Sequence, residues 1–174
     1  MDNRYDSKWG SAAKEGLMLA AITVVCTLLS GLVKNGILNW LLWLVQLVGS
    51  IWLLKIFMNN YGKAHPGEAT FGYGFAVCLM SSVICGAWAF VMAQYIFPDS
   101  AADAFAQARL IIEQTGQDMT DEVNDTFQYV EDNYSKLNSV STFIKCVIEG
   151  LIFSAIINTR NVRTGSAEAD PEQM

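Results

Sequence analysis

Residues 71–97 read FGYGFAVCLMSSVICGAWAFVMAQYIF and contain no Asp, Glu, Lys, Arg, His or Pro. As a helix rising 1.5 Å per residue, these 27 residues would extend about 40 Å. That length exceeds the roughly 30 Å hydrocarbon core of a bilayer. Because buried helices of soluble domains are seldom so long and so free of charge, the stretch predicts a transmembrane helix that ends at Pro98.

The composition of the whole chain also favours a membrane protein. Of its 174 residues, 52% are hydrophobic and 16% are charged, whereas soluble domains carry about 25% charged residues. Three more apolar segments are long enough to span a bilayer, so we predict four transmembrane helices, over about residues 12–33, 37–58, 71–97 and 140–158. The predicted fold class is an all-α integral membrane protein with a helical extramembrane insertion between the third and fourth helices.

Two short connections link the first three predicted helices. Lys34-Asn35-Gly36 contains two residue types that tolerate the left-handed conformation, which predicts a tight helical hairpin. Residues 59–70, NNYGKAHPGEAT, are polar with Gly and Pro and predict a loop.

Residues 161–174 hold almost no apolar side chain and predict a disordered tail. Residues 1–160 then form a single domain, which includes the insertion over 99–139.

The distribution of basic residues predicts the orientation in the membrane. Four spans place both termini on one side, and seven Lys and Arg residues lie on that side, against three on the other. Since basic residues accumulate in cytoplasmic segments, we predict that both termini are cytoplasmic and that the insertion over residues 99–139 lies outside the cytoplasm.

The insertion is acidic, because residues 99–139 hold nine acidic and two basic residues. Its pattern predicts one helix that closes at Gly116 and a second that begins at Asp118 or Thr120. The second helix carries one apolar stripe at steps of four and three, formed by Met119, Val123, Phe127, Val130, Tyr134 and Leu137. The stripe is expected to pack on the first insertion helix or on the membrane surface, or else to dock a partner.

Several short motifs together resemble a known family. They are Trp9, Glu15-Gly16-Leu17, Phe71-Gly72-Tyr73-Gly74-Phe75-Ala76, Tyr95, Pro98, Gly150-Leu151-Ile152 and Ile156-Ile157. In this layout the chain, over residues 9–160, resembles the family catalogued as domain of unknown function 4199. The resemblance implies a small four-helix protein of the bacterial inner membrane, with a membrane glycosyltransferase as a possible neighbour, and it supplies no catalytic residue.

The most informative polar residue is Glu149, which lies near the middle of the fourth predicted helix. An ionised side chain at that depth costs about 2.5–3.5 kcal/mol, so it should be paired, hydrated or protonated. Lys145 is one turn away, at the spacing of an ion pair on one helix. Polar residues on the second and third predicted helices fall at a similar depth. Together with them, the pair predicts an intramembrane polar cluster, which consists of Glu149, Lys145, Gln46, Ser81 and Ser82. The cluster either holds the bundle together or lines a path for a proton or substrate.

Other functional classes find little support in the sequence. The single His65 lies in a predicted loop, so no Ser-His or Cys-His pair can be assembled, and the four cysteines fall in apolar segments without clustered metal ligands. No basic face is available for a nucleic acid. We therefore expect no enzyme activity, no cofactor, no metal and no nucleic-acid partner.

Two hypotheses remain for the function. The first is a non-enzymatic accessory or scaffolding subunit, whose acidic periplasmic helices contact a larger membrane complex. The alternative is a small transporter or flippase-like subunit that uses Glu149 and Lys145. Both predict contact with membrane lipid, and the first predicts another membrane protein or a further copy of the chain as partner.

Overall fold

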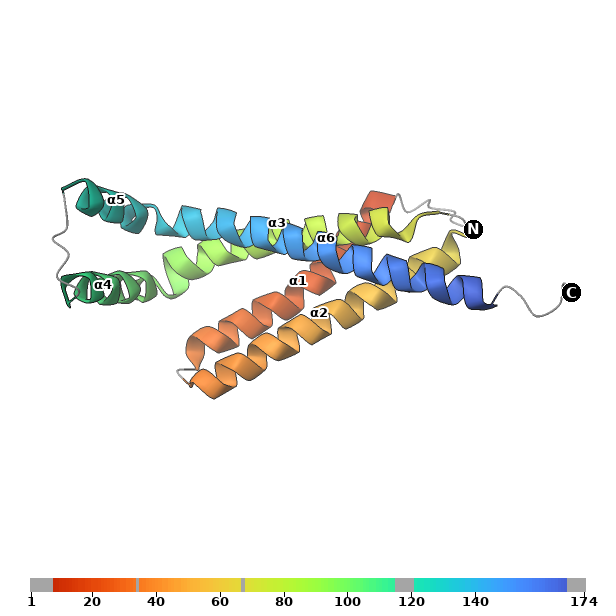
Figure 1. The fold of residues 1–174 in the computed structure, drawn as a ribbon, viewed down its shortest axis with the longest axis horizontal. Helices are drawn as coiled ribbons and strands as arrows, with labels where there is room; N and C mark the ends of the chain where they lie inside the picture. Colours follow the sequence, from red (N-terminus) through yellow and green to blue (C-terminus); the bar gives the residue numbers. More distant parts are fainter. Residues whose placement is uncertain (1–7, 34, 67, 115–120, 169–174) are drawn as a thin grey trace, which may run out of the picture. The chain divides into compact units, whose positions relative to one another are not determined.

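The computed structural model describes residues 8–33, 35–66, 68–114 and 121–168. In these ranges all regular elements are helical (Figure 1): α1 (Lys8–Leu32), α2 (Gly36–Ala64), α3 (Thr70–Val91), the π-helical turn η1 (Met92–Ile96), α4 (Asp99–Gln114), α5 (Asp121–Asp132) and α6 (Tyr134–Glu168). Four segments are long and apolar enough to cross a membrane: Lys8–Leu32, Gly36–Ala64, Thr70–Ile96 and Tyr134–Thr159. The prediction of an all-helical chain with four long apolar helices is thus confirmed for the described residues.

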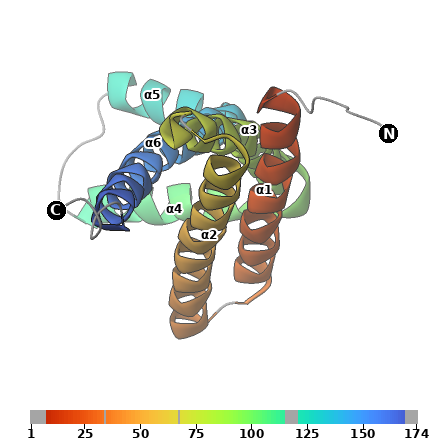
Figure 2. The ribbon, with the colours of Figure 1, turned by 90° about the vertical axis from the view of Figure 1, so that its right-hand side faces the viewer.

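The turn between α1 and α2 differs from the predicted left-handed closure. Asn35 has a φ of −106° and acts as the N-cap of α2, where its side-chain Oδ1 accepts a 3.0 Å hydrogen bond from the backbone N–H of Ile37. Asn35 therefore begins the second helix instead of closing the first. Beyond the turn, Ser30 donates a hydrogen bond to Asn39 at 3.1 Å. Figures 1 and 2 show α1 and α2 side by side.

The second helix is longer than predicted, because α2 continues to Ala64 through residues assigned to a loop. Gly62 within this segment costs a helix about 1 kcal/mol. Tyr61 offsets that cost, since its side chain is buried in the hydrophobic core, as are those of Phe57 and Met58 on the same helix. The connection to α3 is consequently shorter than expected, and Tyr61 has a fixed position on a helix.

The helices around the insertion also begin and end at other residues than the sequence predicts. The third predicted helix ends in η1, where the N–H of Phe97 donates to the carbonyl of Met92 at 2.8 Å, five residues back. The second insertion helix stops at Asp132, because the Asn133 side chain donates to the carbonyl of Tyr129 at 3.0 Å and competes with the helical pattern. The fourth long helix then begins at Tyr134, not near residue 140, and continues to Glu168. Residues 161–168, predicted to be disordered, are therefore helical, and residues 169–174 lie outside the described ranges.

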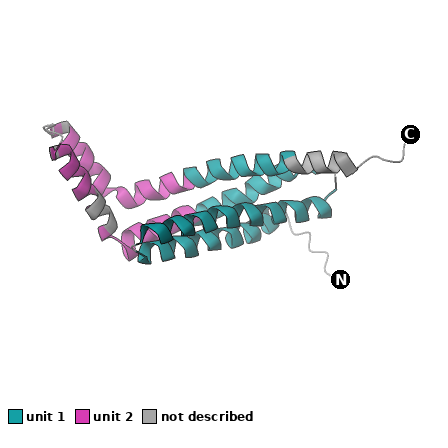
Figure 3. Ribbon diagram, turned by 60° about the horizontal axis from the view of Figure 1, so that its bottom comes forward, with its two compact units in different colours: residues 1–84, 144–174 teal, residues 85–143 magenta. Residues whose placement is uncertain are grey.

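The chain divides into two compact units (Figure 3), of which residues 1–84 and 144–174 form the first and residues 85–143 the second. The core of the first unit draws on all four long helices. Its buried members are Ala12, Leu19, Leu54, Phe57, Met58, Tyr61, Tyr73, Ala76, Val77, Cys78 and Ile157.

Glycines allow close helix contacts inside the first unit. A Cβ at Gly16 of α1 would lie 2.8 Å from the Cβ of Met80 and 2.8 Å from the carbonyl oxygen of Val77, both on α3. A Cβ at Gly150 of α6 would overlap the Cβ of Cys78 on α3. Small residues thus let α1 and α6 approach the α3 backbone, as is usual where apolar helices pack.

The second unit joins the end of α3 to the start of α6 through hydrogen bonds. Ser139 donates to the carbonyl of Gly86 at 2.8 Å, and Ser135 donates to the side chain of Gln94 at 2.8 Å. Gly86 also lies close to Phe143, since a Cβ there would be 3.2 Å from the Phe143 Cβ. These contacts fix the two helix segments from which the acidic insertion begins and ends.

Candidate functional site

A polar and aromatic cluster lies where α1, α2 and α3 meet in the first unit. We call it the tyrosine–carboxylate cluster, and it consists of Glu15, Tyr61, His65, Glu68 and Tyr73. The Tyr73 hydroxyl donates to Glu15 at 2.7 Å, and the Tyr61 hydroxyl donates to Glu68 at 2.5 Å. The Tyr61 and Tyr73 rings stack at 3.9 Å with an interplanar angle of 8°, and His65 stacks on Tyr61 at 4.4 Å.

Burial makes this cluster a structural connection between the three helices. Tyr73 is 1% exposed and Tyr61 is 8% exposed, so both hydroxyls need partners. Phenol donors to ionised carboxylates form the stronger class of hydrogen bond. The first carboxylate, Glu15, comes from α1 and the second, Glu68, from the connection before α3. The cluster therefore fixes α1 and this connection against the paired tyrosines.

A further contact at the start of α3 continues this connection to the fourth long helix. Thr70 donates a 2.8 Å hydrogen bond to the side chain of Asn158 on α6. Within the described ranges, no group of three or more His, Cys, Asp or Glu side chains is placed to hold a metal ion. The contacts of the cluster are hydrogen bonds and ring stacking, which join α1, α2, α3 and the connection that carries Glu68.

Sequence reasoning did not find this cluster. It identified Glu15 and the stretch from Phe71 to Ala76, but it assigned Tyr61 to a loop. The available signal was the spacing of Phe57 and Tyr61, four residues apart, which continues the apolar face of α2 past residue 58.

The predicted intramembrane polar cluster is divided in the structure. Lys145 and Glu149 form an ion pair at 3.8 Å, with side chains 65% and 42% exposed. Ser81 and Ser82 are buried on α3, and the Ser82 hydroxyl donates to the carbonyl of Cys78 on its own helix at 2.7 Å. Gln46 is half-buried on α2. The structure thus brings Lys145 and Glu149 together on an exposed part of α6, whereas the two serines lie in the interior.

The predicted apolar stripe of the insertion is shared between two helices. Phe127 on α5 and Tyr134 at the start of α6 both contact Phe105 of α4 edge to face, with ring centroids 6.3 and 5.8 Å apart. Val130 is half-buried, whereas Val123 and Leu137 are exposed. Met119 lies outside the described residues.

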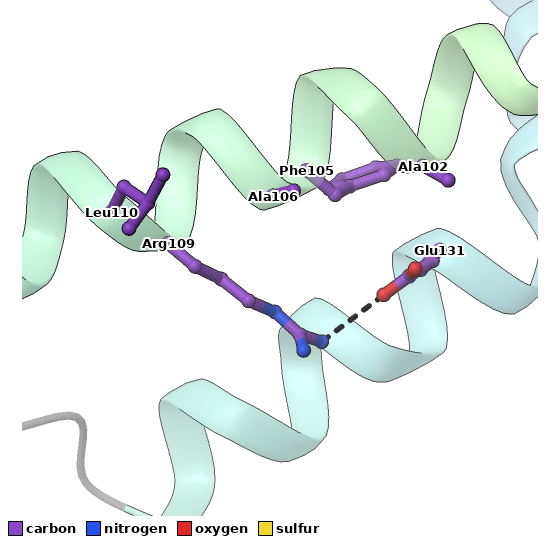
Figure 4. Close-up of a pocket in the computed structure, with 6 residues that line it drawn as sticks. All are labelled: Ala102, Phe105, Ala106, Arg109, Leu110 and Glu131. Atoms are coloured by element: carbon purple, nitrogen blue, oxygen red, sulfur yellow. Dashed lines mark hydrogen bonds and ion pairs between the residues drawn. The ribbon is translucent and has the colours of Figure 1, made fainter.

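A hollow of about 360 Å³ lies between α4 and α5 in the second unit. Figure 4 shows Arg109 of α4 reaching toward Glu131 of α5, with which it forms a 3.0 Å ion pair. The rest of the lining is apolar and comes from α4: Ala102, Phe105, Ala106 and Leu110. The sequence pattern alone did not pair Arg109 with Glu131, because the pairing depends on how the two helices turn back on each other.

Comparison with known proteins finds one family. A family model described as "Protein of unknown function (DUF4199)" matches residues 8–158, which confirms the resemblance inferred from the short motifs. No curated protein and no solved structure matches the chain. The matched residues include the tyrosine–carboxylate cluster, the helix pair α4–α5 and the Lys145–Glu149 ion pair.

Proposed function

The chain belongs to the DUF4199 family of proteins of unknown function, and from this premise we propose that it is a non-enzymatic accessory or scaffolding subunit of a larger membrane complex. In this proposal the four long helices span a bacterial inner membrane, and α4 with α5 forms the surface that contacts the partner, for which a membrane glycosyltransferase is a candidate.

The outer surfaces of the long helices support insertion into a bilayer. The four candidate spans contain 25, 29, 27 and 26 residues. Large apolar side chains such as Leu17, Trp40 and Trp52 are more than half exposed. Exposing such side chains to water is unfavourable by about 25 cal/mol per Å², whereas lipid tails contact them without this cost. Exposed apolar side chains in such number are characteristic of membrane or protein contact.

We predict that both termini are cytoplasmic and that α4 and α5, within the predicted insertion over residues 99–139, are periplasmic, because seven basic residues flank the spans on the first side and three on the other. Alkaline phosphatase fused within the insertion should be active, and the same enzyme fused after residue 174 should be inactive. A cytoplasmic fluorescent reporter gives the reciprocal control. An active phosphatase at the C-terminus would contradict this topology.

The observation that carries the accessory role is the helix pair α4–α5. The ring contacts of Phe105 and the ion pair of Arg109 hold it together. Its surface nevertheless leaves Leu110 55%, Ile111 62% and Tyr129 65% exposed. Since neither helix belongs to a candidate span, these apolar side chains are available to a protein partner, and buried aliphatic and aromatic side chains carry most of the energy of such interfaces.

The test is a double substitution, Leu110→Glu with Ile111→Glu, in the full-length chain. We expect the partner recovered with wild type from native membranes in mild detergent to be lost by at least tenfold, because both charges would have to be desolvated in the interface. Asn124→Asp with Gln128→Glu adds the same charge at exposed positions of α5, at least about 100° around that helix from Tyr129, and should retain the partner. Equal recovery with all three proteins would contradict the proposed contact surface.

The alternative, a transporter subunit that works through Glu149 and Lys145, receives less support. A path for protons or substrate would run through the interior of the bundle or along a water-filled cavity. The Lys145 side chain is instead 65% exposed, which favours an interface on the outer surface of α6.

A further inference from the structure

We propose that the outer face of α6, centred on Lys145 and Glu149, binds a second copy of this chain across a two-fold axis along the membrane normal. The proposal rests on the membrane insertion proposed above. It concerns a surface distinct from the helix pair α4–α5, so the dimer and the contact with another protein are compatible.

In the proposed membrane arrangement the ion pair lies near the middle of the bilayer. The candidate span runs over Tyr134–Thr159. At 1.5 Å per residue, Lys145 lies about 16 Å from its first residue and Glu149 about 15 Å from its last. Both positions are near the middle of a hydrocarbon core about 30 Å thick. Ionised side chains at that depth are expected to face protein or a water-filled cavity, not lipid.

The two charges belong to an exposed row on one face of α6. Lys145, Glu149, Ile152 and Ile156 follow one another at steps of four, three and four, which places them on the same side of a helix. Ile152 and Ile156 are about half exposed, as the two charged side chains are. The monomer therefore presents a row that begins with two charges and continues with two isoleucines toward the C-terminal end of α6.

The opposite face of α6 is already used within the chain. Gly150 contacts Cys78 of α3, Ser154 is fully buried and Ile157 is 6% exposed. These three residues also recur at steps of four and three, about 140° around the helix from the exposed row at 100° per residue. The inner face thus packs on α3, and the outer face remains available for a neighbour.

Charge complementarity identifies the neighbour as a second copy. The Lys145 side chain reaches along the helix to within 3.8 Å of the Glu149 carboxylate, so the two charges lie close to each other. Two copies inserted in the same orientation place their α6 helices parallel, and the closed symmetric arrangement is a two-fold axis. This axis can arrange the four charges as an alternating ring, with unlike charges on the sides and like charges on the longer diagonals. Each carboxylate then gains a second ammonium, and each ammonium gains a second carboxylate.

The test uses two differently tagged full-length copies, co-expressed and purified through one tag in mild detergent. Wild-type copies should recover each other. Two Lys145→Glu copies bring four carboxylates together, and two Glu149→Lys copies bring four ammoniums together, so each combination should lose recovery by at least tenfold. A Lys145→Glu copy with a Glu149→Lys copy restores opposite charges across the axis, and recovery should return to within about threefold of wild type.

Controls separate this dimer from the proposed membrane role. Lys55→Glu changes an exposed charge on α2 and should leave mutual recovery unchanged. Release of the wild-type chain from membranes by alkaline carbonate would contradict the membrane role. With the chain retained in the membrane, the dimer is overturned by wild-type copies that do not recover each other, by like-charged combinations that recover normally, or by a mixed combination that fails to restore recovery.

Discussion

Replacing Gly150 with alanine is expected to destabilise the protein by about 3 kcal/mol, the upper end of the usual range for overpacking. The new Cβ would overlap the Cβ of Cys78 on α3. Because this contact is with an atom attached directly to the backbone, no flexible side chain can move away. Thermal unfolding of the detergent-solubilised protein measures the loss. Leu151→Ala changes an exposed neighbour on the same helix and serves as the control, with little expected loss.

A compensating substitution tests the cause of this loss. In the double variant Cys78→Gly with Gly150→Ala, the Cβ is moved from one helix to the other and the overlap disappears. Most of the lost stability should return, although glycine in the interior of α3 costs about 1 kcal/mol of helix propensity. A Gly150→Ala protein as stable as wild type would show that α3 and α6 do not meet closely at these residues.

Replacing Tyr73 with alanine is expected to cost about 3–5 kcal/mol, the range for removing a large buried aromatic side chain. The ring is 1% exposed and stacks on Tyr61 at 3.9 Å. Tyr73→Phe keeps the ring and removes only the donor to Glu15, so it should cost about 1–3 kcal/mol for the carboxylate left without its partner. Thermal unfolding in detergent again gives the measurement, and Tyr95→Phe, at a residue 72% exposed, is the control.

A double-mutant cycle with Glu15 shows whether the hydrogen bond between Tyr73 and Glu15 accounts for the stability lost in Tyr73→Phe. Glu15→Gln and Tyr73→Phe should each destabilise, and the double variant should lose less than the sum of the two, because both partners of one contact are changed. Additive losses, or a Tyr73→Phe variant as stable as wild type, would mean that the 2.7 Å contact contributes little to holding α1 against α3.

The long helices were predicted well because the length and composition of a continuous apolar run are enough to indicate them. An apolar run of sufficient length indicates a long helix whatever lies beside it, and residues 71–97 are the clearest case. The ends of helices were less predictable, because a competing contact decides each of them. Burial of Tyr61 extends α2 through Gly62, whereas a side-chain hydrogen bond from Asn133 ends α5 before the apolar pattern ends.

The sites required information that the pattern along the chain does not contain. The positions of Lys145 and Glu149 predicted their pairing, since the spacing of one helical turn is local. Whether that pair faces the interior or the surface depends on how α6 is rotated against α3, which Gly150 and Ser154 determine. The contact of Tyr73 with Glu15 joins residues 58 positions apart and depends on the packing of α1 against α3.

The pairing of Gly150 with Cys78 has a consequence for the biosynthesis of the protein. About 70 residues separate the two positions, and at about 5–20 residues per second a ribosome needs roughly 4–14 s to make them. During that interval Gly74 and Cys78 on α3 have no α6 to cover them, whereas α1 and α2 can already pair as a hairpin. A nascent chain that stalls between α3 and α6 would therefore expose a small-residue face of α3 that has no packing partner until α6 is made.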